Sequence, residues 1–535
     1  MLCAKVDTSQ VLLAISHLGF SLSEEEQLLL SAIEGFTADS RQASPSIAFL
    51  ALQGVSRHGR EFIEQAKALG TVLIIEDSSE SDADTNSKQM LITSTPADKQ
   101  VLHLSVVNLA GKLSSFFATL YPQLDGFKQI VAVTGTNGKT SVASFYAQLA
   151  ASIIGKAASI GTLGTLTYDN DGEERCVQEA ENTTPERVSL LNQLAWLAEQ
   201  GYCYVAIEAS SHGIEQGRLT GLPIDTAIFT NLSQDHLDYH GSMQAYGAAK
   251  RALLNNTHIQ NVIVNFDDPE SALWQQSLQS QQRLSGFTLL PNAAKDSLSS
   301  CMQRVFSVSN TQYLSDGLYF SLFESAQAYS IHLGLIGDFN IANYLAAIAA
   351  FRAASVDMEA IALASPRLKG AKGRMEIMAS HHAQVIVDFA HTPDALKQAL
   401  QASRKHTKGS LWVVFGCGGN RDKEKRPLMG SIAVQFADKV ILTQDNSRFE
   451  KPEDIVEDVL SGIAEGETKD QSAAAGKVIS ILDRCEAVKY ALSSAQVGDV
   501  VLIAGKGHEN YLDIQGKKIT YDERAFVQQL AEEYI

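Results

Sequence analysis

Short apolar runs alternate with amphipathic stretches through most of the chain, and each run is followed by polar or glycine-bearing residues. These runs predict strands at Lys128–Val133, Cys203–Ile207, Ala227–Phe229, Val262–Val264, Val385–Val387, Leu411–Phe415, Val440–Leu442 and Val500–Ile503. Apolar residues at helical spacing predict two further helices, with the stripes Val11, Ile15, Leu18 and Leu109, Leu113, Phe116, Leu120. The alternation indicates an α/β protein with mostly parallel sheets. Functional loops should lie at the carboxyl ends of the strands.

The length of 535 residues is too great for one ordinary core and favours about three or four domains. One boundary is expected near residue 106, before the helical stripe that leads into the strand at 128–133. A second is expected near residues 360–370, before a glycine-rich segment. We therefore predict domains at 1–106, 107–362 and 363–535. The polar, acidic segment Ser78–Lys88 is typical of a surface loop.

Composition narrows the classes of protein that the chain can represent. A net charge of −18 argues against a broad nucleic-acid surface, although a few local cations and backbone N–H groups suffice for a phosphate. The six cysteines form no CxxC pair, so neither a zinc site nor a disulfide framework is indicated. No signal peptide and no 18-residue apolar run is apparent, which leaves the cytoplasm by elimination and no expected membrane partner. We expect a monomer.

The segment Val133–Thr140, VTGTNGKT, carries the strongest chemical signal. Gly135 and Gly138 can adopt positive φ and let backbone N–H groups approach phosphates, and Lys139 supplies a cation. The Thr140 hydroxyl can bind Mg²⁺, and the helix that follows, predicted at Ser141–Ala151, points its positive end at the anion. The usual phosphate loop has glycine where this chain has Val133. The alternative is a tight turn between strand and helix whose glycines serve packing alone.

The loop TGTNGKT resembles that of the Mur ligases and of their folylpolyglutamate synthetase relatives. The resemblance extends along nearly the whole chain through motifs that keep a common order, namely Glu181–Glu186, Glu208–Gly213, Asn231–Gly241, Ala249–Lys250, Gly373–Glu376 and Asp388–Pro393. It implies three α/β domains: an N-terminal UDP-binding domain, a central P-loop ATPase with a mostly parallel sheet, and a C-terminal Rossmann-like domain.

Among the Mur ligases, the chain most resembles the members that add the third residue of the peptide. The features that select them are Asp39–Arg41 with Phe49–Gly54, then Asp445–Arg448, then Gly505–Glu509. The resemblance implies ATP-dependent ligation of meso-diaminopimelate to UDP-N-acetylmuramoyl-L-alanyl-D-glutamate in peptidoglycan synthesis. The γ-phosphoryl group of ATP would convert the peptide carboxylate into an acyl phosphate, which the incoming amine attacks. Catalysis would then be mainly positioning and charge neutralisation.

The resemblance also assigns binding residues. Those for ATP are Gly135, Thr136, Asn137, Gly138, Lys139, Thr140, Ser141, Asn343, Arg374 and Asp388. Those for the UDP-linked substrate are Ala38, Ser40, Val55, Ser56, Arg57, Asn182, Thr183, Thr184, Ser210, Gln216 and Arg218. Each set has an ordinary alternative. Thr183 and Thr184 before a proline are also typical of a helix N-cap, and Asn343, Arg374 and Asp388 could be a helix amide, a surface ion pair and a strand-end cap.

The expected catalytic residues are Lys139, Lys250, Glu208 and His236, and the expected ligands of Mg²⁺ are Thr140, Glu208, His236 and Lys250. Glu208 follows a predicted strand, where a carboxylate can hold Mg²⁺. His236 could equally be a capping or core histidine, because Mg²⁺ prefers oxygen ligands. Lys250, on a helix predicted at Tyr246–Leu254, would by default be a surface cation. By resemblance it is instead carbamylated by CO₂ and becomes a carboxylate-like ligand.

The resemblance places the incoming amino acid against Arg421, Asp445, Asn446, Ser447, Arg448, Gly505 and Glu509. Arg448 can bind the second carboxylate of diaminopimelate, which lysine lacks, and Glu509 would receive the distal ammonium. Ser447 stands where the motif has proline, which leaves φ free and restores an N–H. Meso-diaminopimelate is therefore favoured, with L-lysine as the alternative.

Two other functions compete with this one. A folylpolyglutamate-type ligase would share the central and C-terminal domains but lacks the uridine-binding segment and the Asp445–Arg448 element. A protein that merely senses a nucleotide would release no ADP in response to an amino acid, and it leaves Arg421 and Arg448 without a role.

Overall fold

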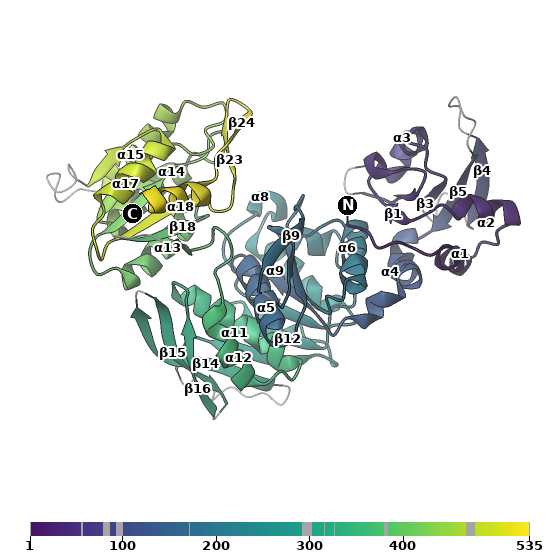
Figure 1. Cartoon of the computed structure of the whole chain (residues 1–535), viewed down its shortest axis with the longest axis horizontal. Helices are drawn as coiled ribbons and strands as arrows, with labels where there is room; N and C mark the ends of the chain where they lie inside the picture. The colour runs from purple at the N-terminus through teal and green to yellow at the C-terminus, as the bar shows by residue number, and fades with distance from the viewer. Residues whose placement is uncertain are drawn as a thin grey trace. The chain divides into compact units, whose positions relative to one another are not determined.

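The computed structural model describes residues 2–54, 57–78, 86–92, 100–170, 172–291, 302–314, 316–325, 327–378, 383–466 and 477–533. The chain folds into two compact units. Figure 1 shows its helices and strands, coloured by residue number. The first unit comprises 1–286, 299–304 and 346–356, and the second comprises 287–298, 305–345 and 357–535.

The N-terminal part of the first unit is a five-stranded sheet with the order β1-β2-β3-β5-β4. Its strands are β1 (Gly35–Thr37), β2 (Ile47–Ala51), β3 (Leu73–Ser78), β4 (Ser87–Ile92) and β5 (Gln100–Val107), and its helices are α1 (Thr8–His17), α2 (Glu24–Leu30), α3 (Ile63–Ala68) and α4 (Leu109–Leu120). All neighbours are parallel except the edge strand β4. The predicted loop at Ser78–Lys88 is wrong at both ends, because Ser78 closes β3 and Ser87 and Lys88 open β4. Residues 79–85 lie outside the described residues.

The rest of the first unit is built on a mostly parallel sheet, in which β6 lies between β11 and β10. Its strands are β6 (Gln129–Thr134), β7 (Ala157–Gly161), β8 (Gly164–Tyr168), β9 (Glu174–Gln178), β10 (Tyr204–Glu208), β11 (Thr226–Phe229), β12 (Asn261–Asn265) and β13 (Arg283–Thr288). Its helices are α5 (Lys139–Ile153), α6 (Arg187–Glu199), α7 (Ser211–Glu215), α8 (Leu237–His240), α9 (Met243–Arg251) and α10 (Ser271–Gln276). The buried strands β6, β10 and β11 bring the ends of three motifs to one edge of the sheet.

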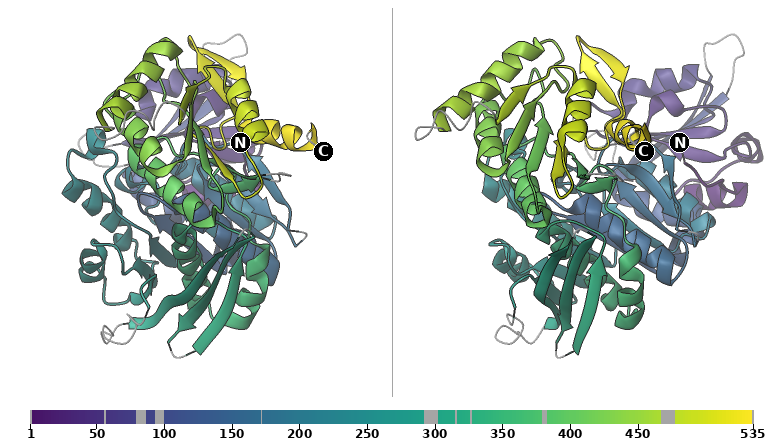
Figure 2. Two further views of the ribbon diagram at one scale, coloured as in Figure 1. Left: turned by 90° about the vertical axis from the view of Figure 1, so that its left-hand side faces the viewer. Right: turned by 60° about the vertical axis from the view of Figure 1, so that its left-hand side comes forward.

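The second unit contains an antiparallel group and a C-terminal sheet. The antiparallel strands β14 (Met302–Leu314), β15 (Gly317–Glu324) and β16 (Gln327–Leu333) lie side by side in Figure 2, and α11 (Asp338–Ala353) and α12 (Met358–Ala364) follow them. The C-terminal sheet has the order β17-β18-β22-β19-β20-β21 and is parallel except for β17.

The C-terminal sheet is covered on both faces. Its strands are β17 (Glu376–Met378), β18 (Gln384–Asp388), β19 (Leu411–Phe415), β20 (Lys439–Leu442), β21 (Val478–Ser480) and β22 (Val500–Ala504), followed by the hairpin β23 (Tyr511–Ile514) and β24 (Lys517–Thr520). The helices are α13 (Pro393–His406), α14 (Lys425–Phe436), α15 (Pro452–Gly466), α17 (Arg484–Ser494) and α18 (Glu523–Glu533). Alternate residues of a strand point to opposite faces of the sheet and pack in two separate apolar clusters. Val413 and Leu502 belong to one cluster, and Val414 and Val501 belong to the other.

The strands expected from the apolar runs are confirmed, and each lies within one residue of its prediction at both ends. The expected α/β class with mostly parallel sheets is confirmed as well. The phosphate-loop helix begins at Lys139, two residues before the prediction. The helix of Lys250 begins at Met243 and ends at Arg251, followed by a short 3₁₀ turn. In the described part of the chain, no helix has the length and apolar character needed to cross a membrane.

Candidate active site

The phosphate loop joins β6 to α5 and needs both of its glycines. Gly135 has φ +149° and Gly138, the N-cap of α5, has φ +88°. A Cβ atom at Gly135 would stand 1.8 Å from Oγ1 of Thr230, so no larger residue fits there. Asn231 accepts from the backbone N–H of Thr136 through its carbonyl at 2.9 Å and from that of Asn137 through its side chain at 2.9 Å. The amides at the start of α5 are therefore the ones placed to meet an anion.

Two lysines meet at this loop. Lys139 donates its Nζ to the carbonyls of Gly135 at 2.9 Å and of Thr136 at 2.8 Å, and Lys250 donates to the same Gly135 carbonyl at 2.9 Å. Lys250 is only 1% exposed and lies over the ring of Tyr246. Burial, and then the charge of Lys139, lower the pKa of Lys250 to about 6. Lys250 is thus a buried amine rather than the surface cation that is the default for lysine, and much of it is neutral near pH 7.

Glu208 ends β10 beside the loop, as the sequence predicted. Its carboxylate is 2% exposed and accepts from the Thr140 hydroxyl at 3.0 Å, from the Thr162 amide at 2.8 Å and from the Thr162 hydroxyl at 3.2 Å. A carboxylate joined to a hydroxyl of the loop is a donor set of the kind that Mg²⁺ prefers. The sequence analysis did not single out Thr162. Its place just after β7 could have drawn attention to it, because functional residues gather at the carboxyl ends of parallel strands.

His236 is held in an unusual backbone conformation at the N-cap of α8, with φ +52°. Its Nε2 lies 3.4 Å from the Asp235 carboxylate, and its ring centroid lies 5.0 Å from that of His212. Within the ranges that the structure describes, no three His, Cys, Asp or Glu side chains gather closely enough to hold a metal ion. The structure therefore unites Thr140 and Glu208 but does not draw His236 into a cluster of that kind.

A polar network continues from Glu208 toward the expected peptide site. Thr162 donates to Thr183 at 3.2 Å, and Thr184 donates to the Glu208 carbonyl at 2.7 Å and contacts the Ser210 hydroxyl at 3.0 Å. The N-cap alternative for the two threonines is wrong, because Glu186 caps α6 by accepting from Val188 and Ser189.

Arg218 completes this network. Its guanidinium donates to the Thr184 carbonyl at 2.5 Å and to the side chain of Gln216 at 2.7 and 3.1 Å. Burial lowers the pKa of Arg218, and Glu186 opposes that effect. Five of the residues expected to bind the UDP-linked substrate are thereby brought into one cluster, namely Thr183, Thr184, Ser210, Gln216 and Arg218.

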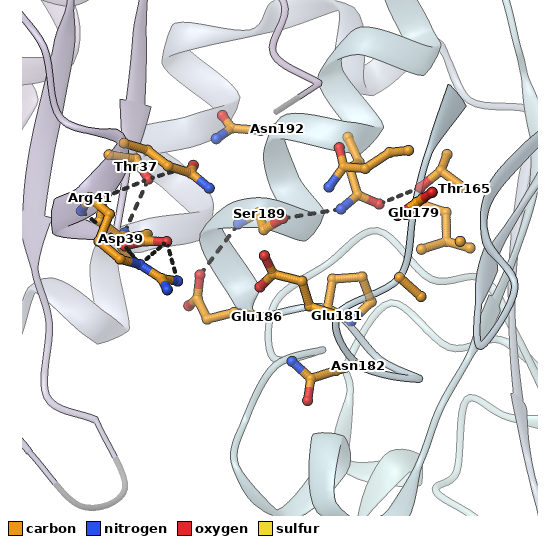
Figure 3. A pocket seen from close by; sticks show the side chains of 18 of the residues that line it. Thr37, Asp39, Arg41, Thr165, Glu179, Glu181, Asn182, Glu186, Ser189 and Asn192 are labelled. Atoms are coloured by element: carbon orange, nitrogen blue, oxygen red, sulfur yellow. Dashed lines mark hydrogen bonds and ion pairs between the residues drawn. The ribbon is translucent and has the colours of Figure 1, made fainter. Parts of the chain in front are cut away.

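A cavity of about 510 Å³ lies beside this network, between the loop after β1 and the start of α6. Among its lining residues are the predicted Ala38, Ser40 and Asn182. Figure 3 shows Arg41 paired with Asp39 on one side and Glu181 and Glu186 on the other. Of the other predicted residues, Arg57 lies 6.0 Å from the Phe62 ring centroid, whereas Val55 and Ser56 lie outside the described residues. Sequence analysis did not anticipate the acidic lining.

The remaining residues expected to bind ATP lie in the second unit. Asn343 on α11 donates to Asn340, and Arg374 lies 4.6 Å over the ring of Phe389. The Asp388 carboxylate at the end of β18 accepts from the backbone of Met375 at 2.8 Å and of Ala390 at 2.9 Å. Burial raises the pKa of this carboxyl group, and Arg374 opposes that effect. Asp388 thus acts as a strand-end cap in the structure, and its contact with ATP stays a prediction.

Three loops of the second unit carry the residues expected to bind the amino acid, and the structure brings these loops together. Arg448, at φ +49°, donates to the carbonyl of Gly419 at 2.7 Å, and its Nε lies 3.9 Å from Asp513. Asn446 donates to the Glu509 carboxylate at 2.9 Å and accepts from the Lys506 ammonium at 3.1 Å. The loops that hold Gly418–Arg421, Asp445–Arg448 and Gly505–Glu509 are therefore one cluster.

The other members of this cluster fit the same picture. Gly505 has φ +112°, and a Cβ atom there would stand 2.6 Å from the Asp445 carboxylate. The exposed Arg421 lies in the same loop as Gly418, whose position faces Arg448. Ser447, where the motif has proline, is 1% exposed, and its hydroxyl has no hydrogen-bond partner among the described residues. The backbone N–H of Glu450 donates to the carbonyl of Ser447 at 3.0 Å, so the chain turns here with serine in place of proline.

Comparison with protein families matches three segments of the chain. The Mur ligase family catalytic domain matches residues 32–114, the Mur ligase middle domain 133–351 and the Mur ligase glutamate ligase domain 373–507. A relative from Vibrio vulnificus is 38% identical over 93% of this chain and 94% of its own length. The chain belongs to the Mur ligase family. It is an ATP-dependent amide-bond ligase, as the members of this family are.

The Mur ligase relatives have consistent names. The Vibrio vulnificus protein is named UDP-N-acetylmuramoyl-L-alanyl-D-glutamate–2,6-diaminopimelate ligase, as is a Vibrio cholerae protein that is 37% identical over 95% of this chain and 96% of its own. A solved structure of an enzyme with that name matches with a TM-score of 0.66 and 34% identity, and the match covers 94% of this chain and 95% of the other.

A more distant structure shares the fold alone. It is a folylpolyglutamate synthase from Mycobacterium tuberculosis, solved with ADP and AMPPCP, with a TM-score of 0.55 and 18% identity. It covers 73% of this chain and 91% of its own.

Proposed function

We propose that this Mur ligase joins meso-diaminopimelate to UDP-N-acetylmuramoyl-L-alanyl-D-glutamate, with ATP converted to ADP and phosphate. The observation that carries the proposal is the continuous polar network in the first unit. It leads from Lys139 and Thr140 of the phosphate loop, through Glu208 and Thr162, to the cluster around Arg218. A nucleotide phosphate at one end and a substrate carboxylate at the other would then meet beside Glu208.

The residues of this network have distinct tasks in the proposed reaction. The amides at the start of α5 and the Lys139 ammonium hold the γ-phosphoryl group, while Arg218 and the hydroxyls of Thr183, Thr184 and Ser210 orient the peptide. An oxygen of the peptide carboxylate attacks the γ-phosphorus, and ADP leaves. The amine of diaminopimelate then attacks the acyl carbon, loses a proton, and displaces phosphate together with that carboxylate oxygen. Lys139 neutralises the charge that develops on the phosphoryl oxygens.

We propose Mg²⁺ as the cofactor, held by Thr140 and Glu208, with His236 and a carbamylated Lys250 as further ligands. The oxygen donors of Thr140 and Glu208 fit this ion, whereas the imidazole of His236 is a less usual ligand. When bound, Mg²⁺ supplies positive charge to the phosphate oxygens. Carbamylation needs a neutral amine, and the buried Lys250, with its lowered pKa, can supply one. The carbamate would give that side chain a negative charge beside Lys139.

The choice of diaminopimelate rests on the three loops of the second unit. Arg448 and Arg421 would bind its distal carboxylate, and Glu509 its distal ammonium, with Asp445, Asn446, Ser447 and Gly505 completing the pocket. With L-lysine the guanidinium of Arg448 would lack the carboxylate that the substrate itself supplies, which disfavours lysine. L-lysine remains the second candidate.

The uridine end of the substrate is proposed to bind at the cavity lined by Ala38, Ser40 and Asn182, with the neighbouring segment Val55–Arg57. Asn343, Arg374 and Asp388 are proposed as further ATP contacts. We also propose that the protein works as a cytoplasmic monomer with small-molecule partners, without nucleic acid or membrane. Sedimentation at working concentration would test the oligomeric state.

Three parallel incubations test the proposed function against the alternatives. The protein, ATP and Mg²⁺ are combined with the UDP-muramoyl dipeptide, and phosphate release is measured with meso-diaminopimelate, with L-lysine and with neither. The proposed function requires release that depends on both the dipeptide and diaminopimelate. Release with lysine alone would support the second candidate. A folylpolyglutamate-type ligase would respond to a folate and glutamate instead, and a nucleotide sensor to no amino acid.

A further inference from the structure

A buried lysine stands behind the amino-acid loops and has no role in the function proposed above. The side chain of Lys506, between Gly505 and Gly507, is 0% exposed. Its ammonium lies 2.6 Å from the Glu509 carboxylate, 3.1 Å from the side-chain oxygen of Asn446 and 3.7 Å from the Asp445 carboxylate. A fully buried cation is costly unless it is paired and hydrogen-bonded, so this one is held by the very side chains expected to receive the substrate.

The charges around Lys506 are nearly balanced. Arg484 is paired with Glu523 in a fully buried ion pair at 2.7 Å, and Arg448 lies 3.9 Å from Asp513. Lys506 then lies between the two carboxylates of Asp445 and Glu509, and the charge of Arg484 also acts on Asp445. Without Lys506, these carboxylates would share one corner and together attract positive charge. With it, one negative charge is neutralised and a single net negative charge remains there.

Lys506 also fixes the positions of the Glu509 and Asn446 side chains. Its ammonium and the amide of Asn446 reach the same Glu509 oxygen, at 2.6 and 2.9 Å. The side-chain oxygen of Asn446 accepts both from Lys506 and from the Asp513 backbone at 2.8 Å, which ties the loop of Asp445–Arg448 to β23. Since Lys506 is buried, it acts on a substrate through Glu509 and Asn446 and is a positioning residue.

We propose that Lys506 determines which amino acid this ligase prefers, an inference that rests on the proposed function. An amino acid whose far end carries both an ammonium and a carboxylate suits a corner with one net negative charge beside Arg448. An amino acid whose far end carries an ammonium alone suits two uncompensated carboxylates. Lys506 therefore shifts the preference toward diaminopimelate and away from lysine by holding one of the two carboxylates neutralised.

The test compares Lys506→Met, which keeps an unbranched chain one atom shorter and removes the charge, with Lys506→Arg, which keeps the charge. Values of kcat and KM are measured for meso-diaminopimelate and for L-lysine at saturating ATP. In Lys506→Met we expect kcat/KM for diaminopimelate to fall about 30-fold, mainly through KM, and kcat/KM for lysine to fall far less. The ratio of the two should move about 10-fold toward lysine, and Lys506→Arg should keep it within about 3-fold of the wild type.

Two controls separate specificity from folding. Lys477→Met removes a half-buried lysine of the same unit that donates to the Val434 carbonyl, and it should leave the ratio unchanged. The double variant Lys506→Met with Asp445→Asn removes one charge of each sign. Its ratio of kcat/KM for the two amino acids should therefore return part of the way to the wild-type value. Should Lys506→Met lose the cooperative thermal transition of the wild type, Lys506→Gln takes its place under the same criterion.

An equal fall for both amino acids, or an unchanged ratio, would overturn the inference and leave Lys506 a structural residue. A wild-type protein that ligates neither amino acid would instead overturn the proposed function. The two failures are therefore told apart before any variant is compared.

Discussion

The phosphate loop of the first unit and the amino-acid loops of the second unit are built on different physical principles. The phosphate loop is one contiguous segment. Its conformation depends on two glycines with positive φ and on Lys139, which donates to the carbonyl of Gly135, and its anion site is made of backbone amides. The amino-acid site draws on three loops that are distant in sequence, held by ion pairs of the buried arginines Arg484 and Arg426 with Glu523 and Glu450. A phosphate can be held by backbone groups, whereas a specific amino acid requires side chains of matched charge.

This difference predicts where a single substitution does most damage to chemistry and where it changes specificity. In the first unit, a change at the loop should remove phosphoryl transfer with any amino acid. In the second unit, a change should alter the choice of amino acid or the stability of the unit.

Lys250→Ala should lower kcat by about 10³-fold or more, because it removes the buried group that would become the carbamate ligand. A short carboxylic acid such as acetate should restore part of the activity. Since the neutral amine is the form that reacts with CO₂, reactivation of CO₂-depleted wild type should rise as the pH increases through about 6. Steady-state ligation assays measure the fall in kcat, the rescue by acetate and the pH dependence of reactivation. Lys156→Ala, at an exposed lysine, is the matched control. Full activity of Lys250→Ala without rescue would be incompatible with the carbamate.

Arg484→Met should destabilise the second unit by about 3 kcal/mol, because it leaves the buried Glu523 unpaired. Arg484 also donates to the carbonyls of Gln444 at 3.3 Å and Ala504 at 2.8 Å, which precede two of the amino-acid loops. Urea unfolding gives the change in free energy. Arg404→Ala, which breaks an exposed pair with Asp438, should cost far less than this. If the two variants lost equal free energy of unfolding, the buried Arg484–Glu523 pair would contribute no more to stability than an exposed pair.

Arg448→Ala should lower kcat/KM for meso-diaminopimelate by about 100-fold and leave KM for ATP within about 3-fold. The reason is that its guanidinium would bind the distal carboxylate, which takes no part in phosphoryl transfer. Initial rates with each substrate varied in turn measure the two effects. If KM for ATP rose as steeply as KM for diaminopimelate, Arg448 would be structural.

Glu450→Gln should have the smallest effect, about 1 kcal/mol, and that effect should depend on pH. Hydrogen bonds from Arg426 lower the pKa of Glu450 to about 2. Its contribution to stability is therefore fully present above the ordinary carboxyl pKa of about 4.5 and is lost as the pH falls toward about 2. Urea unfolding at about pH 6 and about pH 3 should show the wild type and the variant converging at the lower pH. If the difference in free energy of unfolding between the wild type and Glu450→Gln were the same at both pH values, the ionised Glu450 carboxylate would not be its cause.

The phosphate loop could be predicted from the sequence because all of its parts are adjacent. The strand before it, its glycines, Lys139 and the helix after it were expected in the order in which the structure has them. Glu208 was also predictable, since it directly follows an apolar strand. The role of Asn231 in holding the loop could not be read, because its contacts with Thr136 and Asn137 depend on how β11 lies beside β6.

The amino-acid site was predicted only in part. The motifs that hold Arg448 and Glu509 were found by resemblance, but the ring of charges behind them was not. Nothing in the sequence distinguishes Arg484, Arg426 and Lys506 from ordinary surface cations. Their partners are distant in the chain: Glu523 lies 39 residues from Arg484, Glu450 lies 24 from Arg426, and Asn446 lies 60 from Lys506. Pairing over such separations is set by sheet topology and helix packing, which periodicity does not reveal.

Transfer of a phosphoryl group to the peptide carboxylate is the central step of the proposed mechanism, and an isotope measurement tests this step directly. The carboxylates of D-glutamate in the UDP-muramoyl dipeptide are labelled with oxygen-18, and the phosphate released during ligation of meso-diaminopimelate is analysed by mass. The account predicts one labelled oxygen in each phosphate, because that atom bridged carbon and phosphorus before the amine attacked. Phosphate without the label, released while the peptide bond forms, would contradict it.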